Sequence, residues 1–213
     1  MTLPPFATYL FDLDGTILDS VALILSSYRH TALVHTGAAP EDAVWLAGLG
    51  TPLRTQLRHL SEDPAVIEAM AETYREHNLS NHDAMARPYD GVVDAVRALA
   101  SRAELGLVTS KLHYGALRGL RTAGLEDAFD VVIGADDVPR HKPDPTPVLA
   151  ALERLGASAT SAVFVGDSPH DMASGRAAGV RTAAALWGPF PRQALEPHQP
   201  DFWLGTPTEL HSL

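Results

Sequence analysis

Two aspartates with catalytic spacing, Asp12 and Asp14, follow a short apolar run near the start of the chain, and a glycine comes next. A carboxylate can attack phosphorus and form an acyl phosphate. A second carboxylate close by can protonate the leaving oxygen and later activate water. Asp12 is therefore a candidate nucleophile and Asp14 a candidate general acid/base. Two further acids, Asp167 and Asp171, follow a later apolar run and are candidates for the same site.

Carboxylates gathered in one pocket need a counter-charge, because two of them about 4 Å apart repel by roughly 4 kcal/mol at an effective dielectric of 20. Mg²⁺ suits such a cluster, since it needs only a few protein oxygens besides water and phosphate. The chain has only two lysines, Lys111 and Lys142, so each is worth considering as a functional residue. Acids, a cation and Lys142 together predict a site for an anionic group, and phosphate is the obvious candidate.

The elements that must bring these residues together are short apolar strands that alternate with amphipathic helices. The predicted strands are Tyr9–Phe11, Leu105–Val108, Val131–Ile133, Ala162–Val165, Thr182–Leu186 and Phe202–Leu204. Such alternation predicts an α/β fold, a Rossmann-like parallel sheet with helices on both faces in three layers. In such sheets ligands bind beyond the carboxyl ends of the strands. We therefore expect Asp12, Asp14, Asp167, Asp171 and Lys142 to lie at that edge.

A helical block interrupts the alternation just after the first strand. Helix-start signals at Thr51-Pro52 and Asp63-Pro64 and a stop signal at Gly37 make residues 20–82 nearly all helical. We expect an inserted α-helical cap domain over 19–84 and a core domain over 1–18 and 85–213. The hinges are expected near Leu18–Ser20 and Asp83–Pro88, with Ser20 and Arg87 governing the opening and closing of the cap.

Four motifs in order resemble those of haloacid-dehalogenase-superfamily phosphatases, and the insertion sits where the first cap type of that family belongs. The motifs are Asp12–Thr16, Thr109 at the end of a strand, Lys142 within His141–Pro145, and Gly166–Asp171. The resemblance covers essentially the whole chain.

The resemblance implies a role for each residue. Asp12 would be nucleophile and Mg²⁺ ligand, and Asp14 general acid/base with its backbone carbonyl on the metal. Asp167 would be a direct ligand, which Asp171 supports through water or hydrogen bonds; the alternative for Asp171 is a helix cap. Thr109 and the Ser110 N–H would hold phosphate oxygens, and Lys142 would neutralise the nucleophile and the phosphoryl group.

Two basic residues are further candidates for substrate binding. Lys111 is either a substrate contact or a charge at the start of a helix. Arg54 in the cap is a candidate for a substrate carboxylate or phosphate, and otherwise lies on a solvated helix face. The segment Trp187–Phe190 is expected to form a turn after a strand, with lining of the site as the alternative.

The nearest branch in resemblance contains phosphoglycolate phosphatases and similar bacterial pyrophosphatases. We therefore expect a Mg²⁺-dependent phosphatase that hydrolyses a small phosphomonoester, first of all 2-phosphoglycolate, through a phospho-aspartate. Inorganic pyrophosphatase and sugar-phosphate phosphatase or mutase are the alternatives on the same scaffold. A dehalogenase is disfavoured by Asp14, and a phosphonate hydrolase by the absence of lysine in residues 20–82. A non-enzymatic phospho-receiver is a distant alternative.

The net charge and composition limit the classes of molecule that this protein is expected to bind. A net charge of −10 over 213 residues makes nucleic acid and anionic membranes poor partners, so the expected partner is a small phosphorylated metabolite. Met1–Phe6 lacks a secretory pattern and no run of 18 apolar residues occurs, so the expected location is cytoplasmic. Cysteine is absent, which excludes disulfides and thiolate chemistry. A monomer and a homodimer are both open.

Overall fold

Residues 6–213 are described by a computed structural model, and they form a six-stranded parallel sheet. Its order is β5 (Val131–Ile133), β4 (Glu104–Val108), β1 (Thr8–Phe11), β6 (Ala162–Gly166), β7 (Arg181–Ala185) and β8 (Phe202–Leu204). The expected α/β class and parallel sheet are confirmed. The fifth predicted strand lies one residue earlier than expected. Residues 1–5, which carry most of the N-terminal segment considered above, lie outside the described residues.

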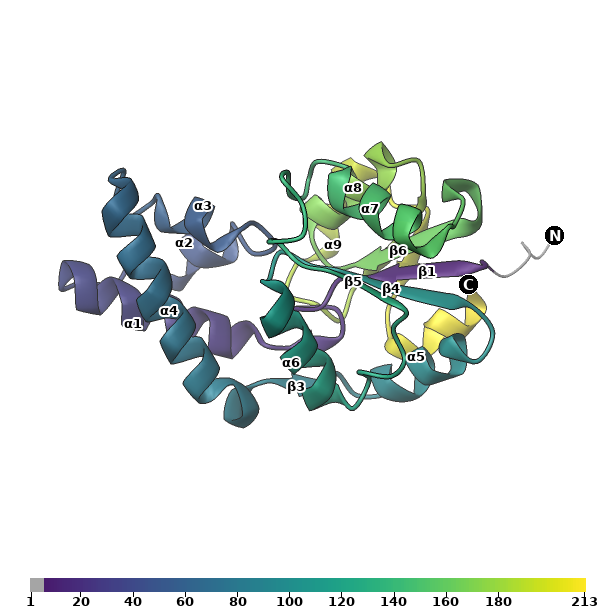
Figure 1. The fold of residues 1–213 in the computed structure, drawn as a ribbon, viewed down its shortest axis with the longest axis horizontal. Coiled ribbons are helices and arrows are strands. Elements are labelled where there is room, and N and C mark those ends of the chain that lie inside the picture. Colours follow the sequence, from purple (N-terminus) through teal and green to yellow (C-terminus); the bar gives the residue numbers. More distant parts are fainter. Residues whose placement is uncertain (1–5) are drawn as a thin grey trace.

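Helices cover both faces of this sheet (Figure 1). On one side lie α5 (Val92–Ala100), α6 (His113–Ala123) and the 3₁₀ helix η3 (Pro207–Ser212), and on the other α7 (Thr146–Leu155) and α8 (Pro169–Ala177). Successive strand residues point to opposite faces. Tyr9 and Phe11 of β1 therefore enter the first core, and Leu10 enters the second. Short helices, η1 (Ala159–Ser161), α9 (Arg192–Leu195) and η2 (Glu196–His198), complete this part.

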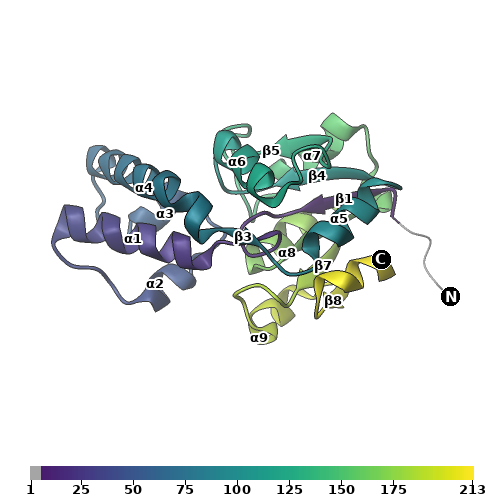
Figure 2. The same ribbon diagram turned by 90° about the horizontal axis from the view of Figure 1, so that it is seen from below.

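The inserted block forms a helical cap with its own apolar cluster. Its helices are α1 (Val21–Thr36), α2 (Asp42–Leu46), α3 (Leu53–Leu57) and α4 (Pro64–Met85). The long helices α1 and α4 pack together, and Figure 2 shows them apart from the sheet. Tyr28 stacks on the buried Trp45 with ring centroids 4.5 Å apart. Because these side chains bury one another, the cap has a small apolar core of its own.

Two extended segments connect the cap to the sheet. β2 (Leu18–Asp19) and β3 (Arg87–Pro88) pair antiparallel, as a two-stranded ribbon at the position of the expected hinges. Helix α4 runs three residues further than predicted, and non-helical stretches separate the cap helices. The division into 1–18 with 85–213 and 19–84 stays a prediction. Within residues 6–213, no helix is both long and apolar enough to cross a bilayer.

Candidate active site

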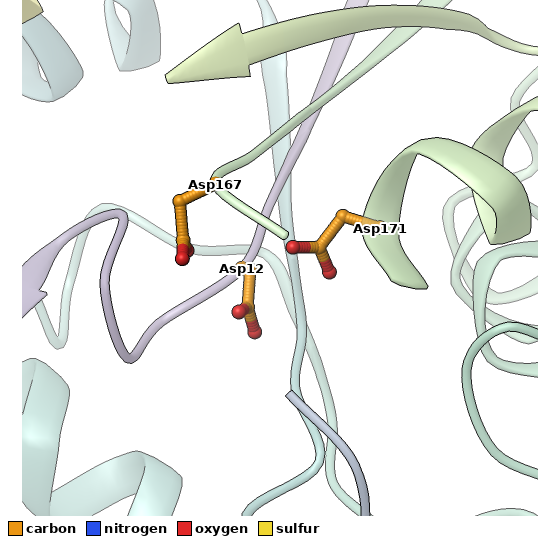
Figure 3. Close-up of side chains that lie close together, drawn as sticks. All are labelled: Asp12, Asp167 and Asp171. Carbon is orange, nitrogen blue, oxygen red and sulfur yellow. The ribbon is translucent and has the colours of Figure 1, made fainter. Parts of the chain in front are cut away.

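Three buried carboxylates converge at the carboxyl edge of the sheet. Asp12 follows β1, Asp167 follows β6, and Asp171 lies in the first turn of α8 (Figure 3). One carboxylate oxygen from each residue lies within 4.8 Å of the corresponding oxygens of the other two. All three residues are at most 3% exposed. The parallel strands supply two of the acids because β1 and β6 are neighbours in the sheet.

Lys142 provides the counter-charge inside this cluster. Its Nζ lies 2.9 Å from Asp12 Oδ1 and 2.6 Å from Asp171 Oδ1, and it also donates to the Val108 carbonyl at 3.3 Å. The Lys142 side chain is 1% exposed. A buried ammonium with two carboxylate partners is stable only as long as those partners stay charged, so the lysine and the acids depend on one another.

Burial and mutual repulsion shift the titration of these groups. Burial raises the pKa of Asp12 to about 7; Lys142 acts against this rise and Asp171 adds to it. Burial, Asp171 and Asp12 together hold the pKa of Asp167 well above its usual range. For Lys142, burial alone would lower the pKa, but the charges of Asp12 and Asp171 raise it above its ordinary value. The cluster thus has more negative charge than Lys142 alone can neutralise.

The donor set fits a hard divalent cation. Although Asp12 Oδ1 is close to Lys142, the approach is poorly aligned, and within residues 6–213 no group donates a hydrogen bond to this buried oxygen. Buried polar oxygens normally have a partner. Two or three carboxylate oxygens in one small space are the ligands that such a cation prefers. Asp12, Asp167 and Asp171 could therefore hold it.

Neighbouring hydroxyls and close packing fix the orientation of the acids. Thr16 Oγ1 donates to Asp167 Oδ1 at 2.8 Å, and Ser168 Oγ donates to Asp171 Oδ2 at 2.6 Å. Asp171 also accepts from the Ser168 N–H at 3.0 Å, which completes a capping box at the start of α8. Asp171 therefore completes the capping box with Oδ2 and faces Lys142 with Oδ1. Its support of a metal stays a prediction.

Asp14 lies beside the triad with different partners. Lys111 Nζ is 2.8 and 3.0 Å from its two carboxylate oxygens, and Ser20 Oγ donates to Oδ1 at 2.6 Å. Burial would raise the Asp14 pKa, but Lys111 and Ser20 outweigh it and hold that pKa below its usual range. Ser20 occupies the N-cap position of α1, but its side chain makes no capping hydrogen bond there. It connects the hinge to the candidate general acid/base instead.

The strand-end hydroxyls lie where expected. Thr109 is buried at the end of β4, and its Oγ1 accepts from the Lys111 N–H at 3.2 Å. Ser110 Oγ donates to the Gly50 carbonyl of the cap at 2.5 Å. Ser110 therefore contacts the cap as well as the site, a contact that its position in the sequence did not predict.

A cavity of about 350 Å³ lies between the cap and the sheet edge. Asp12, Asp14, Thr109 and Lys111 are among the sheet-side residues that line it, and residues of α1, α3 and α4 line it from the cap. Arg54 also lines it, but its guanidinium pairs in a bidentate manner with Glu68 at 2.7 and 2.8 Å. Most of the sequence-predicted residues thus line one cavity, while Lys142 and Asp171 lie behind it in the buried charge cluster and Arg54 is engaged by Glu68.

Several residues of the site were missed from the sequence. Thr16, Ser20 and Ser168 hold the acids, and each lies next to a motif, which is the signal that could have drawn attention to them. The segment Trp187–Phe190 follows β7, where a turn was expected. It also contacts the site, because Trp187 Nε1 donates to the Thr16 carbonyl at 2.9 Å. Pro189 lines the cavity, as the alternative reading had it.

Comparison with known proteins agrees with this arrangement. The family described as haloacid dehalogenase-like hydrolase matches residues 9–185. Pyrophosphatase PpaX of Halalkalibacterium halodurans is 36% identical over 95% of this chain and 94% of its own length. Pyrophosphatase PpaX of Bacillus pumilus is 38% identical with the same coverage. A solved structure from Lactobacillus plantarum, described as a candidate phosphoglycolate phosphatase, superposes with a TM-score of 0.88 at 26% identity, over 99% of this chain and 100% of its own.

Proposed function

The chain belongs to the haloacid dehalogenase-like hydrolases, and from that premise we propose that it is a Mg²⁺-dependent phosphatase that hydrolyses inorganic pyrophosphate. The observation that carries this proposal is the buried triad of Asp12, Asp167 and Asp171 with Lys142 among them. The pyrophosphatase alternative is favoured over 2-phosphoglycolate because full-length relatives at 36–38% identity are pyrophosphatases.

Asp12 would act as the nucleophile. A carboxylate oxygen attacks one phosphorus atom, the new O–P bond forms as the bridging P–O bond breaks, and inorganic phosphate leaves with the bonding electron pair. Water then attacks the phosphorus of the phospho-aspartate, the bond between phosphorus and the Asp12 oxygen breaks, and the second phosphate leaves as the Asp12 carboxylate is restored. Asp14 accepts a proton from the attacking water. Lys142, 2.9 Å from Asp12, would stabilise the negative charge in both steps.

A bound Mg²⁺ would be held by Asp12, Asp167 and the Asp14 backbone carbonyl, with Asp171 in support, and would supply charge neutralisation for the phosphoryl oxygens. Thr16 and Ser168 would keep the acids oriented through the hydrogen bonds described above. Thr109, Ser110 and Lys111 would bind phosphate oxygens on the sheet side of the cavity. Arg54 would reach the substrate only by leaving Glu68.

The ionised state of Asp14 suits the second step of the proposed reaction. Burial would raise the pKa of Asp14, but Lys111 and Ser20 outweigh burial and hold the pKa low, so Asp14 is ionised at neutral pH. Departing phosphate is stable as an anion, whereas the alkoxide released from a phosphomonoester needs a proton. An ionised Asp14 is already suited to the second step, in which it accepts one.

The substrate assignment is tested by initial rates on a panel with saturating Mg²⁺. We expect kcat/KM for pyrophosphate to exceed that for 2-phosphoglycolate and for hexose phosphates by about tenfold or more, which is about 1.4 kcal/mol of transition-state preference. If kcat/KM were larger for 2-phosphoglycolate than for pyrophosphate, the protein would be a phosphomonoesterase instead. A sugar bisphosphate formed during turnover would indicate a mutase, and stable phosphorylation without turnover a receiver.

Metal addition is expected to stabilise the protein in a pH-dependent way. With Mg²⁺ at about 100 times its Kd, binding adds about 2.7 kcal/mol, or roughly 5 to 10 °C in Tm for a chain of this size. Because burial raises the Asp12 pKa to about 7, a proton occupies this carboxylate below pH 7 and must leave before a cation binds. The increase in Tm should therefore be larger at pH 8 than at pH 6, as thermal melts can measure.

Two variants control that measurement. Asp167→Asn removes a triad ligand and should abolish the Mg²⁺-dependent shift. Asp127→Asn, whose side chain is 75% exposed, should keep it. An equal shift in Asp167→Asn would place the cation elsewhere.

A further inference from the structure

The segment after β7, Trp187–Phe190, contacts both the catalytic edge and the cap. Trp187 Nε1 donates to the Thr16 carbonyl at 2.9 Å. Gly188 packs so closely on the edge of the sheet that a side chain there would overlap Asp167 and would come within 2.6 Å of the Gly15 carbonyl oxygen. These two contacts fix the segment to the loop that follows β1 and to a candidate metal ligand.

Phe190 continues from this fixed part into the cap. It packs against the apolar cluster of the cap, which includes Trp45 and Leu57, and also against the small core cluster of Met172, Ala184 and Leu195. Phe190 is therefore a side chain shared by the two parts. Its partial burial depends on the cap lying on the sheet edge, as it does here.

The other cap–core contacts include an ion pair between Arg118 of α6 and Asp83 of α4 at 3.0 and 3.2 Å, which is exposed to water and therefore contributes little to closure. Ser110 Oγ donates to the Gly50 carbonyl at 2.5 Å, and a side chain at Gly50 would come within 3.0 Å of Ser168 Oγ. A single hydroxyl–carbonyl bond at a water-accessible interface contributes only modestly, because water replaces it when it breaks. An apolar ring that returns to water on opening has no such replacement, so it favours closure.

We propose that Trp187–Phe190 is a latch for the cap, in which Trp187 and Gly188 anchor the segment to the catalytic edge and Phe190 holds the cap closed. Phe190 is a positioning residue in this account: it acts on the cap and does not touch the reacting atoms. Loss of about half the burial of a phenylalanine should raise the ratio of open to closed cap about tenfold, equivalent to about 1.4 kcal/mol.

The test uses the absence of cysteine from this chain, which allows clean labelling of an introduced pair. Leu33→Cys in α1 and Leu149→Cys in α7 place one spin label on the cap and one on the core, both at exposed positions. Pulsed electron–electron distances are then recorded without substrate, in the labelled full-length parent and in labelled Phe190→Ala. The parent should give one dominant distance, that of the closed cap. In Phe190→Ala the ratio of the open to the closed population should be about ten times that of the parent.

Conservative and matched variants make the result specific. Phe190→Leu keeps apolar bulk and should restore most of the parent distribution. Phe202→Ala truncates another partly buried phenylalanine, one that packs on the sheet-side core beside Phe6, and should leave the distribution unchanged. If Phe190→Ala does not fold, Phe190→Val gives the same comparison with a smaller truncation.

The proposal is overturned if Phe190→Ala retains the parent distance distribution, or if Phe202→Ala broadens it equally. It concerns the site of the proposed function but its readout needs no turnover. A chain that fails to hydrolyse pyrophosphate could therefore still show the latch, and an active enzyme could lack it.

Discussion

Asp12→Asn should lower kcat for pyrophosphate by at least about 10⁴-fold, the scale of losses seen when a catalytic nucleophile is removed. Asparagine has nearly the same shape as aspartate, but its amide is a poor nucleophile and a weaker ligand for a hard cation. The measurement is phosphate release under saturating pyrophosphate and Mg²⁺, with the parent and variant at equal concentration.

The fold should survive this change. Burial and Asp171 raise the Asp12 pKa and Lys142 opposes them, so a neutral side chain at residue 12 relieves repulsion within the triad while Lys142 keeps Asp171 as its partner. The metal-free variant should melt within about 4 °C of the parent, or ~1 kcal/mol. Asp127→Asn on the surface should keep full activity. Retention of a tenth or more of the parent rate in Asp12→Asn would remove Asp12 from the nucleophile role.

Lys142→Met should reduce both activity and stability. Methionine fills similar space but leaves Asp12 and Asp171 buried without their positive partner. Breaking a buried charge pair in this way costs about 3 to 5 kcal/mol, or roughly 10 °C in Tm for a chain of this size. Loss of the charge next to the phosphoryl group should lower kcat by about 10² to 10³-fold. Melts without metal at pH 8 and steady-state rates measure the two effects.

A neighbouring cation in the same loop provides the matched control. Arg140 is 71% exposed and lies 3.3 Å from Asp144, so Arg140→Met should cost less than about 1 kcal/mol and leave kcat unchanged. Protonation of the acids relieves their repulsion, so the stability deficit of Lys142→Met should shrink as pH falls from 8 toward 6. A deficit that is equal at both values, or equal in the two variants, would contradict the buried charge network.

The sheet and the strand-end residues could be predicted from the sequence because both follow from local signals. Apolar runs that end in Asp12, Thr109 and Asp167 place those side chains at one edge of a parallel sheet, whatever the details of the loops. The placement of Lys142 required more, since it comes from a loop after the edge strand β5; its rarity in the composition and its motif supplied the signal.

The remaining contacts depend on tertiary geometry that local patterns do not encode. Ser20 has the residue type of a helix cap, but the turn after β1 brings it to Asp14. Arg54 has the type of a substrate ligand, but packing of α3 on α4 brings it to Glu68. Phe190 reads as part of a turn, and only the folded chain shows that it reaches the cap. The roles assigned to the site residues stay predictions until the variants are measured.

The account depends most on Asp12 becoming phosphorylated beside the cation-binding triad. Asp14→Asn keeps the nucleophile and removes the proposed base of the second step, so its phosphoenzyme should accumulate when pyrophosphate and Mg²⁺ are added. Acid quenching followed by peptide mass spectrometry locates the phosphate. The account predicts one phosphorylated peptide, with the modification on Asp12. Phosphate on another residue, or continued turnover by this variant with Asp12 unmodified, would contradict it.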